Sequence, residues 1–174
     1  PDSLEAVQPF LENLFNDPDI FKLPFQKTLA KIISKNRAPK VMEEYKLIGG
    51  KSPLGEWTEI QRKGLEALLR KNNVDADVLV AMRYWHPLTQ EVVKKVKEKG
   101  YEKILLLPLY PQFSISTTGS SFNEWNRIYD GDKKKLIYVQ SYHNNKKYAL
   151  AINQRIDETL KKFPQDLLKS VQLV

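Results

Sequence analysis

Two short apolar runs constrain the fold of this chain more than any other feature. They are residues 78–82, Val-Leu-Val-Ala-Met, and residues 104–109, Ile-Leu-Leu-Leu-Pro-Leu, and polar and aromatic residues follow each run directly. An amphipathic segment of helical length separates them and ends at Gly100, a favourable C-terminal cap. Buried parallel strands joined by a helix have this pattern, so the sequence predicts a βαβ unit. Both polar clusters would then lie at the carboxyl edge of the sheet, where open α/β folds bind ligands.

The remaining apolar periodicities predict further helices and strands on either side of this unit. Residues 56–73 carry apolar side chains at helical spacing, and residues 136–139 are a third strand candidate. The other expected elements are a helix starting at Asp2, helices over 25–34 and 41–47 separated by a basic turn over 35–40, a tight turn over 49–53, helices over 121–129 and 146–163, and a strand over 170–174. This order predicts an α/β fold in three layers, with a parallel sheet flanked by helices in a flavodoxin-like or Rossmann-like topology.

The composition excludes several classes of site. The chain contains no cysteine, which excludes disulfides, thiolate metal ligands and cysteine nucleophiles within these residues. Its net charge of +7 includes lysine clusters that we interpret as solvated helix faces and loop tips, although an anionic membrane surface or a nucleic acid could also attract them. No nucleic-acid-binding motif accompanies the charge, so we expect no nucleic-acid partner. No apolar run in the sequence has the length needed to span a bilayer.

The residues that follow the first apolar run are the main candidates for a ligand site. Arg83 comes directly after Met82, and a cation at a strand end needs an anionic partner in the protein or an anionic ligand. Tyr84 and His86 come next, although aromatic residues mostly serve packing and a single histidine is weak evidence. A hydroxyl-rich stretch over 114–120 would present hydroxyls and backbone N–H groups to an anion at the start of a helix.

Other signals of catalysis are weak in this chain. With two histidines and no cysteine, we do not expect a transition-metal site made from these residues alone. The Gly49-Gly50 turn lacks the spacing of a phosphate-binding loop, and a simple corner between helices explains it equally well. The residues by themselves therefore predict a site for an anionic, partly flat and apolar ligand, without a complete catalytic centre.

Three motifs in this order resemble the amino-terminal half of the ferrochelatase family. They are Ile48-Gly-Gly-Lys-Ser-Pro-Leu54, Met82-Arg-Tyr-Trp-His-Pro-Leu-Thr89, and the run from Tyr110-Pro-Gln to Thr117-Thr-Gly-Ser-Ser121. Members of this family insert ferrous iron into protoporphyrin IX to form protohaem in haem biosynthesis. The resemblance therefore implies a metal chelatase, a lyase, whose partners are protoporphyrin IX and ferrous iron. Iron would be a substrate, and no further cofactor is expected.

The resemblance also implies which residues contact the porphyrin. Basic residues would lie near the propionates, a Tyr and a Ser would flank the Gly-Gly turn, and the Arg-Tyr-x-His-Pro motif would supply the rest. The implied substrate-binding residues are Arg37, Lys40, Tyr45, Ser52, Arg83, Tyr84 and His86. We interpret His86 as a residue that orients the turn between strand and helix. Leu47 stands where some members carry a basic residue, which weakens the contacts expected on that side.

The resemblance further predicts how the domains are organised. Residues 1–174 would be the amino-terminal α/β domain of a two-domain chelatase, without its first strand and without the second domain, which carries the metal-binding histidine and glutamate. We therefore expect no catalytic residue and no metal ligand in this segment, and no activity of the segment alone. We expect a cytoplasmic location, with the protein either free in the cytoplasm or in peripheral contact with a membrane. Two other functions remain open: a non-catalytic anion-binding module of flavodoxin-like fold, and a cobalt or nickel chelatase.

Overall fold

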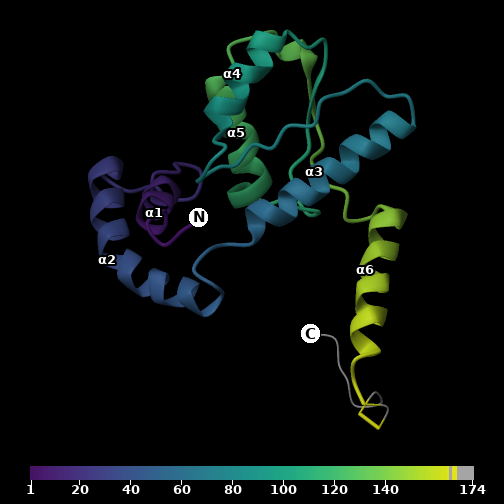
Figure 1. Ribbon diagram of the computed structural model, residues 1–174. Coiled ribbons are helices and arrows are strands. Elements are labelled where there is room, and N and C mark those ends of the chain that lie inside the picture. Colours follow the sequence, from purple (N-terminus) through teal and green to yellow (C-terminus); the bar gives the residue numbers. More distant parts are fainter. Residues whose placement is uncertain (165, 168–174) are drawn as a thin grey trace.

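The computed structural model describes residues 1–164 and 166–167 of the chain, and the strand expected over 170–174 lies outside them. This part contains six α-helices and two short strands (Figure 1). In chain order the elements are α1 (Val7–Phe15), α2 (Gln26–Leu47), α3 (Leu54–Lys71), α4 (Thr89–Lys99), β1 (Ile104–Leu106), the π-helix η1 (Ile115–Gly119), α5 (Ser120–Ile128), the 3-10 helix η2 (Lys133–Lys135), β2 (Leu136–Tyr138) and α6 (Lys146–Leu160). The predicted α/β class is confirmed.

Within the described residues, β1 and β2 form a parallel pair in which Ile104 lies opposite Leu136. Helices α4 and α5 pack against one face of this pair and enclose a core. The core consists of Val92, Val93 and Val96 of α4, Trp125 and Tyr129 at α5, and Ile104 and Leu136 of the strands. On the opposite face, Leu105 and Ile137 are 59% and 45% exposed. The structure thus contains one helical layer on the sheet, and a third layer stays a prediction.

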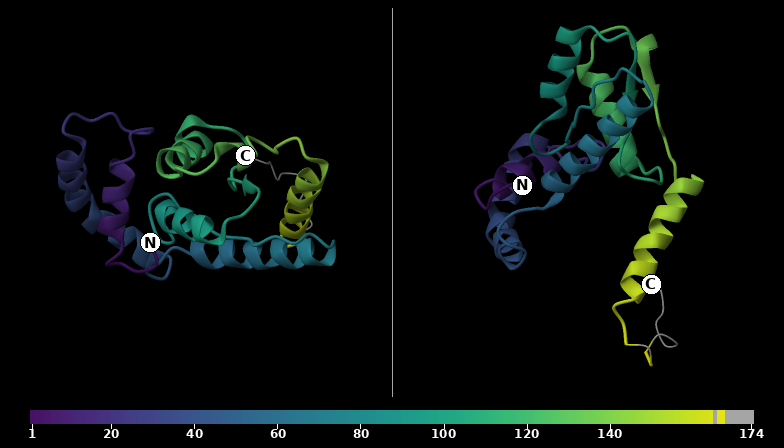
Figure 2. Two further views of the ribbon diagram at one scale, coloured as in Figure 1. Left: turned by 90° about the horizontal axis from the view of Figure 1, so that it is seen from above. Right: turned by 45° about the vertical axis from the view of Figure 1, so that its right-hand side comes forward.

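A second apolar core lies between α1 and α2. Val7, Leu11 and Phe15 of α1 pack against Ala30 and Ala38 of α2, and all five are buried. Small residues on α2 allow the two helices to approach closely. This pair lies at one end of the molecule, whereas α6 stands apart from the other helices in Figure 1 and in the right-hand view of Figure 2.

The structure corrects the prediction of two helices separated by a basic turn over 35–40. Residues 26–47 form one helix, and Pro39 lies inside it. A proline removes one hydrogen bond of the helix and normally bends it, and α2 changes direction along its length in Figure 1. Ala30 and Ala38 before the proline, and Val41 and Met42 after it, pack into the core shared with α1, which holds both sides of the proline in one helix. Tertiary contacts have here outweighed a local helix breaker.

The predicted strand over 78–82 is also wrong for most of its length. Only Met82 makes a bridge, in which its N–H donates to the Pro87 carbonyl at 2.8 Å and its carbonyl accepts from Thr89 N–H at 3.1 Å. A strand requires a neighbour along its whole length, and residues 78–81 have no ladder partner among the described residues. The first helix also starts later than predicted, at Val7 instead of near Asp2.

Most other elements are confirmed. Helix α3 covers the predicted long amphipathic segment, and α4 ends at Gly100 in the left-handed conformation with φ 66°. Gly49 and Gly50 have φ values of 92° and 80°, which explains why the turn after α2 contains two glycines. Asn145 caps α6 by accepting N–H groups of Lys147 and Tyr148. In the described part of the chain, no helix is long and apolar enough to cross a membrane.

Candidate functional site

Asp17 is the centre of a buried polar cluster that joins three distant parts of the chain. Its side chain has no exposed surface, and its Oδ2 atom accepts three hydrogen bonds from side chains. The donors are Arg83 Nη2 at 2.8 Å, Tyr84 Oη at 2.7 Å and Ser120 Oγ at 2.5 Å. The other carboxylate oxygen, Oδ1, accepts the backbone N–H of Asp19 at 2.8 Å. Such a set of donors is what a buried carboxylate requires in order to stay ionised.

The guanidinium group of Arg83 is held from two sides. Besides Asp17, it donates through Nε to Ser120 Oγ at 2.9 Å, and its Nη1 atom lies 3.5 Å from Glu124 Oε1. A guanidinium carries five N–H groups, and the hydrogen bonds to Ser120 and Asp17 use two of them. The Arg83 side chain is 14% exposed, so its remaining donors lie close to the surface.

The electrostatics of the cluster favour a charged Asp17 and a neutral Tyr84. Burial opposes ionisation of Asp17, but hydrogen bonds from Ser120, Tyr84 and the Asp19 backbone, together with the charge of Arg83, outweigh it and lower its pKa. Burial raises the pKa of Tyr84, and the neighbouring Asp17 raises it further while Ser120 and Arg83 oppose the rise. The Tyr84 hydroxyl therefore keeps its proton and donates a hydrogen bond to the carboxylate.

Local structure explains how these residues reach one another. Asp17 directly follows the C-cap of α1, and its side chain closes a turn over Pro18 by accepting from Asp19 N–H. Ser120 is the first residue of α5 and is fully buried. The π-helix η1 leads into it, an element that often occurs at functional sites.

The π-helix corrects the prediction of a loop that offers free N–H groups over 114–120. The N–H groups of Thr117 and Gly119 both donate to the Ser114 carbonyl, at 3.3 Å and 2.9 Å. The side chain of Thr118 is fully buried, and that of Ser120 binds Asp17. These backbone donors are used within the protein and do not form an anion site.

A second, more exposed layer of charge covers the cluster. Arg127 donates to Asp19 Oδ2 at 2.7 Å and to Glu124 Oε2 at 2.9 Å, and Asn123 donates to Asp19 Oδ1 at 2.8 Å. Glu124 therefore lies between two arginines, Arg83 and Arg127. Its side chain is 26% exposed, which makes it the carboxylate of the network nearest to solvent on the Arg83 side.

Four of the predicted porphyrin-binding residues lie elsewhere, on α2 and the turn that follows it. Arg37 and Lys40 are exposed on α2, and the described residues place no carboxylate within ion-pair distance of either. The Arg37 guanidinium lies 5.9 Å from the ring centre of Phe15. Burial raises the pKa of Tyr45, whose carbonyl accepts the Gly50 N–H at 2.8 Å, and the Ser52 hydroxyl accepts the Leu54 N–H at 3.2 Å.

His86 lies at the start of α4, exposed to solvent. Its Nδ1 atom is 2.9 Å from Glu91 Oε1, and the other Glu91 oxygen accepts the Leu88 N–H at 2.7 Å. The hydrogen bond from Leu88 and the neighbouring His86 lower the pKa of Glu91. His86 is thus linked to the first turn of α4. The structure brings Arg83 and Tyr84 together at Asp17, but in the part of the chain that it describes no hydrogen bond or ion pair joins them to Arg37, Lys40 or Tyr45.

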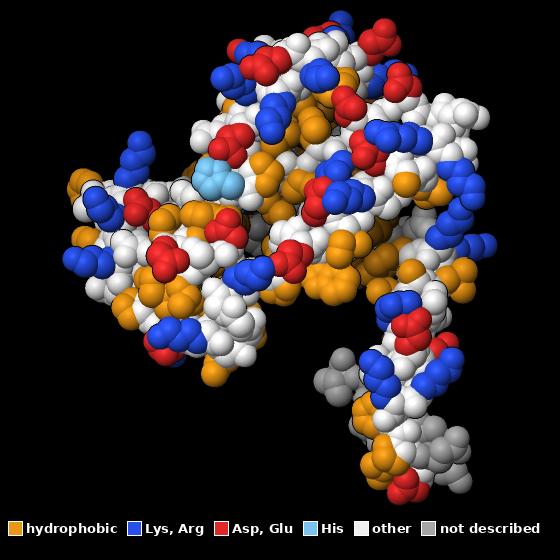
Figure 3. All heavy atoms as spheres, in the orientation of Figure 1, with side chains coloured by type: hydrophobic (Ala, Val, Ile, Leu, Met, Phe, Trp, Pro, Cys, Tyr) orange, Lys and Arg blue, Asp and Glu red, His pale blue; other side chains and the backbone are white. Residues whose placement is uncertain are grey.

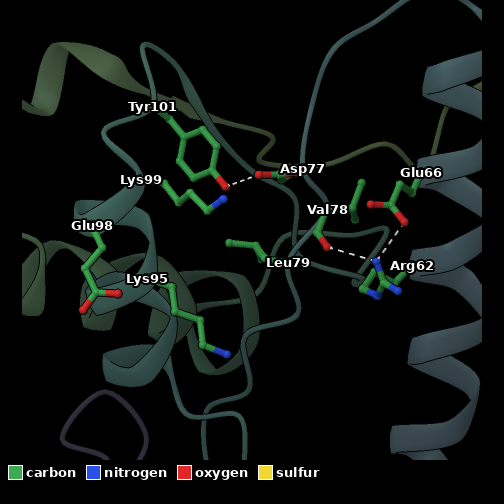
Figure 4. Close-up of a pocket in the computed structure, with 9 residues that line it drawn as sticks. All are labelled: Arg62, Glu66, Asp77, Val78, Leu79, Lys95, Glu98, Lys99 and Tyr101. Carbon is green, nitrogen blue, oxygen red and sulfur yellow. Dashed lines mark hydrogen bonds and ion pairs between the residues drawn. The ribbon is translucent and has the colours of Figure 1, made fainter.

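An open pocket of about 420 Å³ lies between α3 and α4, away from all seven predicted residues (Figure 4). Its charged lining is mixed, with Arg62, Lys95 and Lys99 opposed by Glu66, Asp77 and Glu98. Tyr101 donates to Asp77, and this hydrogen bond raises the pKa of Tyr101 to about 12. Equal numbers of opposite charges give no preference for an anion. The described residues also contain no group of three or more side chains able to hold a metal ion.

Asp17 is the residue that sequence reasoning missed. The Asp17-Pro18-Asp19 sequence indicated only the end of a helix. Its partners are 66 to 103 positions away along the chain, so no local pattern could reveal them. The one usable signal was Arg83, because a cation beside a buried run requires an anion.

Comparison with known proteins gives a consistent result. The family model described as Ferrochelatase matches residues 1–174. The ferrochelatase of Aquifex aeolicus (strain VF5) is 46% identical over 165 residues, which are 93% of this chain and 52% of that protein. The ferrochelatase of Gloeobacter violaceus is 45% identical, covering 94% of this chain and 52% of the relative, and Ferrochelatase-2, chloroplastic, of Arabidopsis thaliana is 45% identical, covering 94% and 34%. The chain spans about half the length of the bacterial relatives it matches.

Proposed function

Because this chain belongs to the ferrochelatase family, we propose that it forms part of an enzyme that inserts ferrous iron into protoporphyrin IX to give protohaem. The observation that carries the proposal is the family match over residues 1–174, which includes all three motifs. In this proposal the chain is the amino-terminal domain of a two-domain chelatase, in three layers of chelatase-like topology. It supplies walls and anchors for the porphyrin, and the metal ligands belong to the other domain. Iron is a substrate, and no resident cofactor is required.

Arg37 and Lys40 are the anchors that we propose for the propionates. Both are exposed cations three positions apart on α2, so they lie on neighbouring parts of the helix surface. Neither has an ion-pair partner among the described residues, which leaves both charges available to an anionic ligand. Tyr45 and Ser52 border the Gly-Gly turn that ends the same helix and add hydroxyl groups.

Arg83, Tyr84 and His86 complete the proposed set, in the segment that leads into α4. Arg83 contributes the donors that Asp17 and Ser120 leave free, and Tyr84 stays neutral beside it. When both groups of anchors bind the porphyrin, part of the binding free energy can bend the macrocycle. The bent ring exposes its pyrrole nitrogens to an incoming metal. A cytoplasmic location, and contact of the lysine clusters with a membrane, stay predictions from the sequence.

The test is a porphyrin titration of the whole polypeptide that carries this chain, followed by Soret absorbance, with zinc insertion assayed in parallel. We expect micromolar binding, insertion, and about tenfold weaker binding for Arg37→Ala or Lys40→Ala, since a hydrogen bond to a charged group contributes about 1.5 kcal/mol. Lys35→Ala is the matched control, because Lys35 is an exposed lysine on a different side of the same helix.

Two results would contradict the proposal. A folded parent protein that neither binds porphyrin nor inserts zinc would favour the non-catalytic anion-binding module instead. Equal losses for Lys35→Ala and Lys40→Ala would show that binding depends on general positive charge, without specific anchors on α2.

A further inference from the structure

We propose that Phe15 is a positioning residue, whose ring holds the Arg37 guanidinium at the edge of the core between α1 and α2, ready to pair with a propionate. This inference rests on the proposed function, in which Arg37 is a propionate anchor. The Arg37 Cζ atom lies over the Phe15 ring, 5.9 Å from its centre. A guanidinium within about 6 Å of a ring centre is attracted to the negative face of the ring. Phe15 is only 7% exposed, so it acts through Arg37 and not by contact with a ligand.

The position of Arg37 on α2 explains why its side chain reaches this ring. Ile33 and Val41, four residues before and after Arg37, lie on the same row of the helix surface. Both pack against the core that α2 shares with α1, so Arg37 places a charged residue in an otherwise apolar row. A long aliphatic stem lets an arginine follow such a row while its charged end stays exposed, here over Phe15.

The Phe15 ring is itself held in place. It belongs to the buried core, and the ring of Phe21 packs against it with the two ring centres 5.2 Å apart. Gln26, the first residue of α2, donates from Nε2 to the carbonyls of Phe15 and Phe21, both at 2.9 Å. These contacts fix the end of α1 against the start of α2. The ring is therefore a firm support that restricts the conformations open to the guanidinium lying on it.

An aromatic ring holds a cation without bringing a negative charge to it. In the part of the chain that the structure describes, the Arg37 side chain makes no hydrogen bond or ion pair, and its contact with Phe15 leaves it exposed. Arg83, by contrast, is held by the carboxylates of Asp17 and Glu124, whose charges compete with those of an anionic ligand. Arg37 thus keeps its charge and its N–H groups for a ligand carboxylate while its orientation is restricted.

The neighbouring anchor, Lys40, is not held in this way. Among the described residues its ammonium group has neither an aromatic nor a carboxylate partner. A propionate that binds Lys40 must restrict a free side chain, whereas Arg37 is already restricted before the ligand arrives, which lowers the entropic cost of binding. A change at Phe15 should therefore affect the contact of the porphyrin with Arg37 and leave the contact with Lys40 unchanged.

The experiment measures binding of protoporphyrin IX and of its dimethyl ester, in the same detergent, to the whole polypeptide that carries this chain and to its variants. Phe15→Leu keeps an apolar side chain but removes the ring. We expect it to weaken binding of the diacid about threefold and to leave binding of the ester unchanged, because the ester offers no carboxylate to Arg37. Phe21→Leu is the matched control: it removes the adjoining ring of the same core and should change neither affinity.

A double-mutant cycle separates positioning from a general effect on the fold. In the Arg37→Ala background, Phe15→Leu should have no further effect on the diacid. An equal effect in that background, or a Phe15→Leu variant that weakens both ligands equally or neither, would overturn the role of Phe15 alone. A parent that does not bind the diacid would overturn both this inference and the proposed function.

If Phe15→Leu does not fold, mono-, di- and trifluorinated phenylalanine at position 15 give the same test with little change in shape. Fluorine withdraws electron density from the face of the ring, so affinity for the diacid should fall with each added fluorine while affinity for the ester stays constant. A constant affinity for the diacid across the series would show that the ring does not position Arg37.

Discussion

At the scale of single residues, Asp17 shows how a buried charge can stabilise a fold. An isolated carboxylate in an apolar interior would be strongly unfavourable, but Asp17 is surrounded by donors from Arg83, Tyr84 and Ser120. Removal of one partner from such a pair typically costs about 3 kcal/mol, because it leaves the other charge buried and unpaired. We therefore expect Asp17 and Arg83 to tolerate substitution less well than any exposed ion pair in the described part of the chain.

The lowered pKa of Asp17 predicts a pH dependence of stability. The unfolded chain has an ordinary Asp pKa of about 3.9, so in acid it binds a proton more readily than the folded protein does. The contribution of Asp17 is complete above this value and is lost as the pH falls through the lower folded pKa. In urea unfolding, the difference in free energy between wild type and Asp17→Asn should be largest near neutral pH and should shrink below about pH 4.

The control for this measurement is Asp130→Asn. Its ion pair with Lys97 is largely exposed and is screened by solvent, so the substitution should change stability little at any pH. A difference for Asp17→Asn that stays constant between neutral pH and pH 3 would contradict the assignment of a charged, hydrogen-bonded Asp17.

At the scale of elements, the turn between α2 and α3 depends on backbone conformation alone. Gly50 has φ 80°, and a Cβ atom at this position would meet nothing within 4 Å. Only the strain of a left-handed backbone opposes Gly50→Ala, which we expect to lower the free energy of unfolding by about 1 kcal/mol. Gly64 lies inside α3, also in open space and with an ordinary φ. Gly64→Ala should therefore raise the free energy of unfolding by about 1 kcal/mol.

Chemical unfolding of the two variants checks this prediction, because the free energy of unfolding should fall for Gly50→Ala and rise for Gly64→Ala. Opposite signs for the same substitution would separate backbone conformation from any effect of the added methyl group. If Gly50→Ala were as stable as wild type, the turn would have to adopt another conformation, and the prediction would be wrong.

Elements that depend on local signals were largely predictable from sequence. Gly100 marked the end of α4, and the apolar spacing of α3 gave its limits to within a few residues. Pro39 and the apolar run 78–82 led to wrong predictions for the same reason, because the conformation of both depends on tertiary contacts with other elements. At the site, Arg83 and Tyr84 were found from sequence, whereas Asp17 was not, because its role exists only in the folded arrangement.

At the scale of the whole molecule, apolar side chains remain uncovered over a large surface. They gather along α3 and between α3 and α6 in Figure 3. Trp57, Ile60 and Leu68 of α3 are each more than half exposed, and Leu105 of β1 is 59% exposed. Helix α3 has no buried residue at all. Surfaces of this kind normally bind another part of a protein or cause association.

We expect the 174-residue chain alone to bind the dye ANS strongly and to self-associate at micromolar concentration. The double variant Trp57→Gln, Leu105→Gln should bind less dye and should remain monomeric to higher concentration, as measured by fluorescence and light scattering. A matched double variant at the buried positions Val93 and Trp125 should instead lose its folded structure. Weak dye binding by the wild-type chain would show that this surface is covered in solution.

The position of Asp17 has a further consequence for the order of events during folding. Its contacts close segments of 66 and 103 residues, far longer than any turn or helix in the described part of the chain. The entropic cost of such closure must be met before the hydrogen bonds can form, so topology makes these contacts slow. Helices such as α2 and α3 can form within microseconds, whereas the Asp17 cluster has to wait for the chain to become compact. A nascent chain leaving the ribosome would therefore form α1 to α4 before residue 120 emerges, and Arg83 would gain Ser120, its second buried partner, only afterwards.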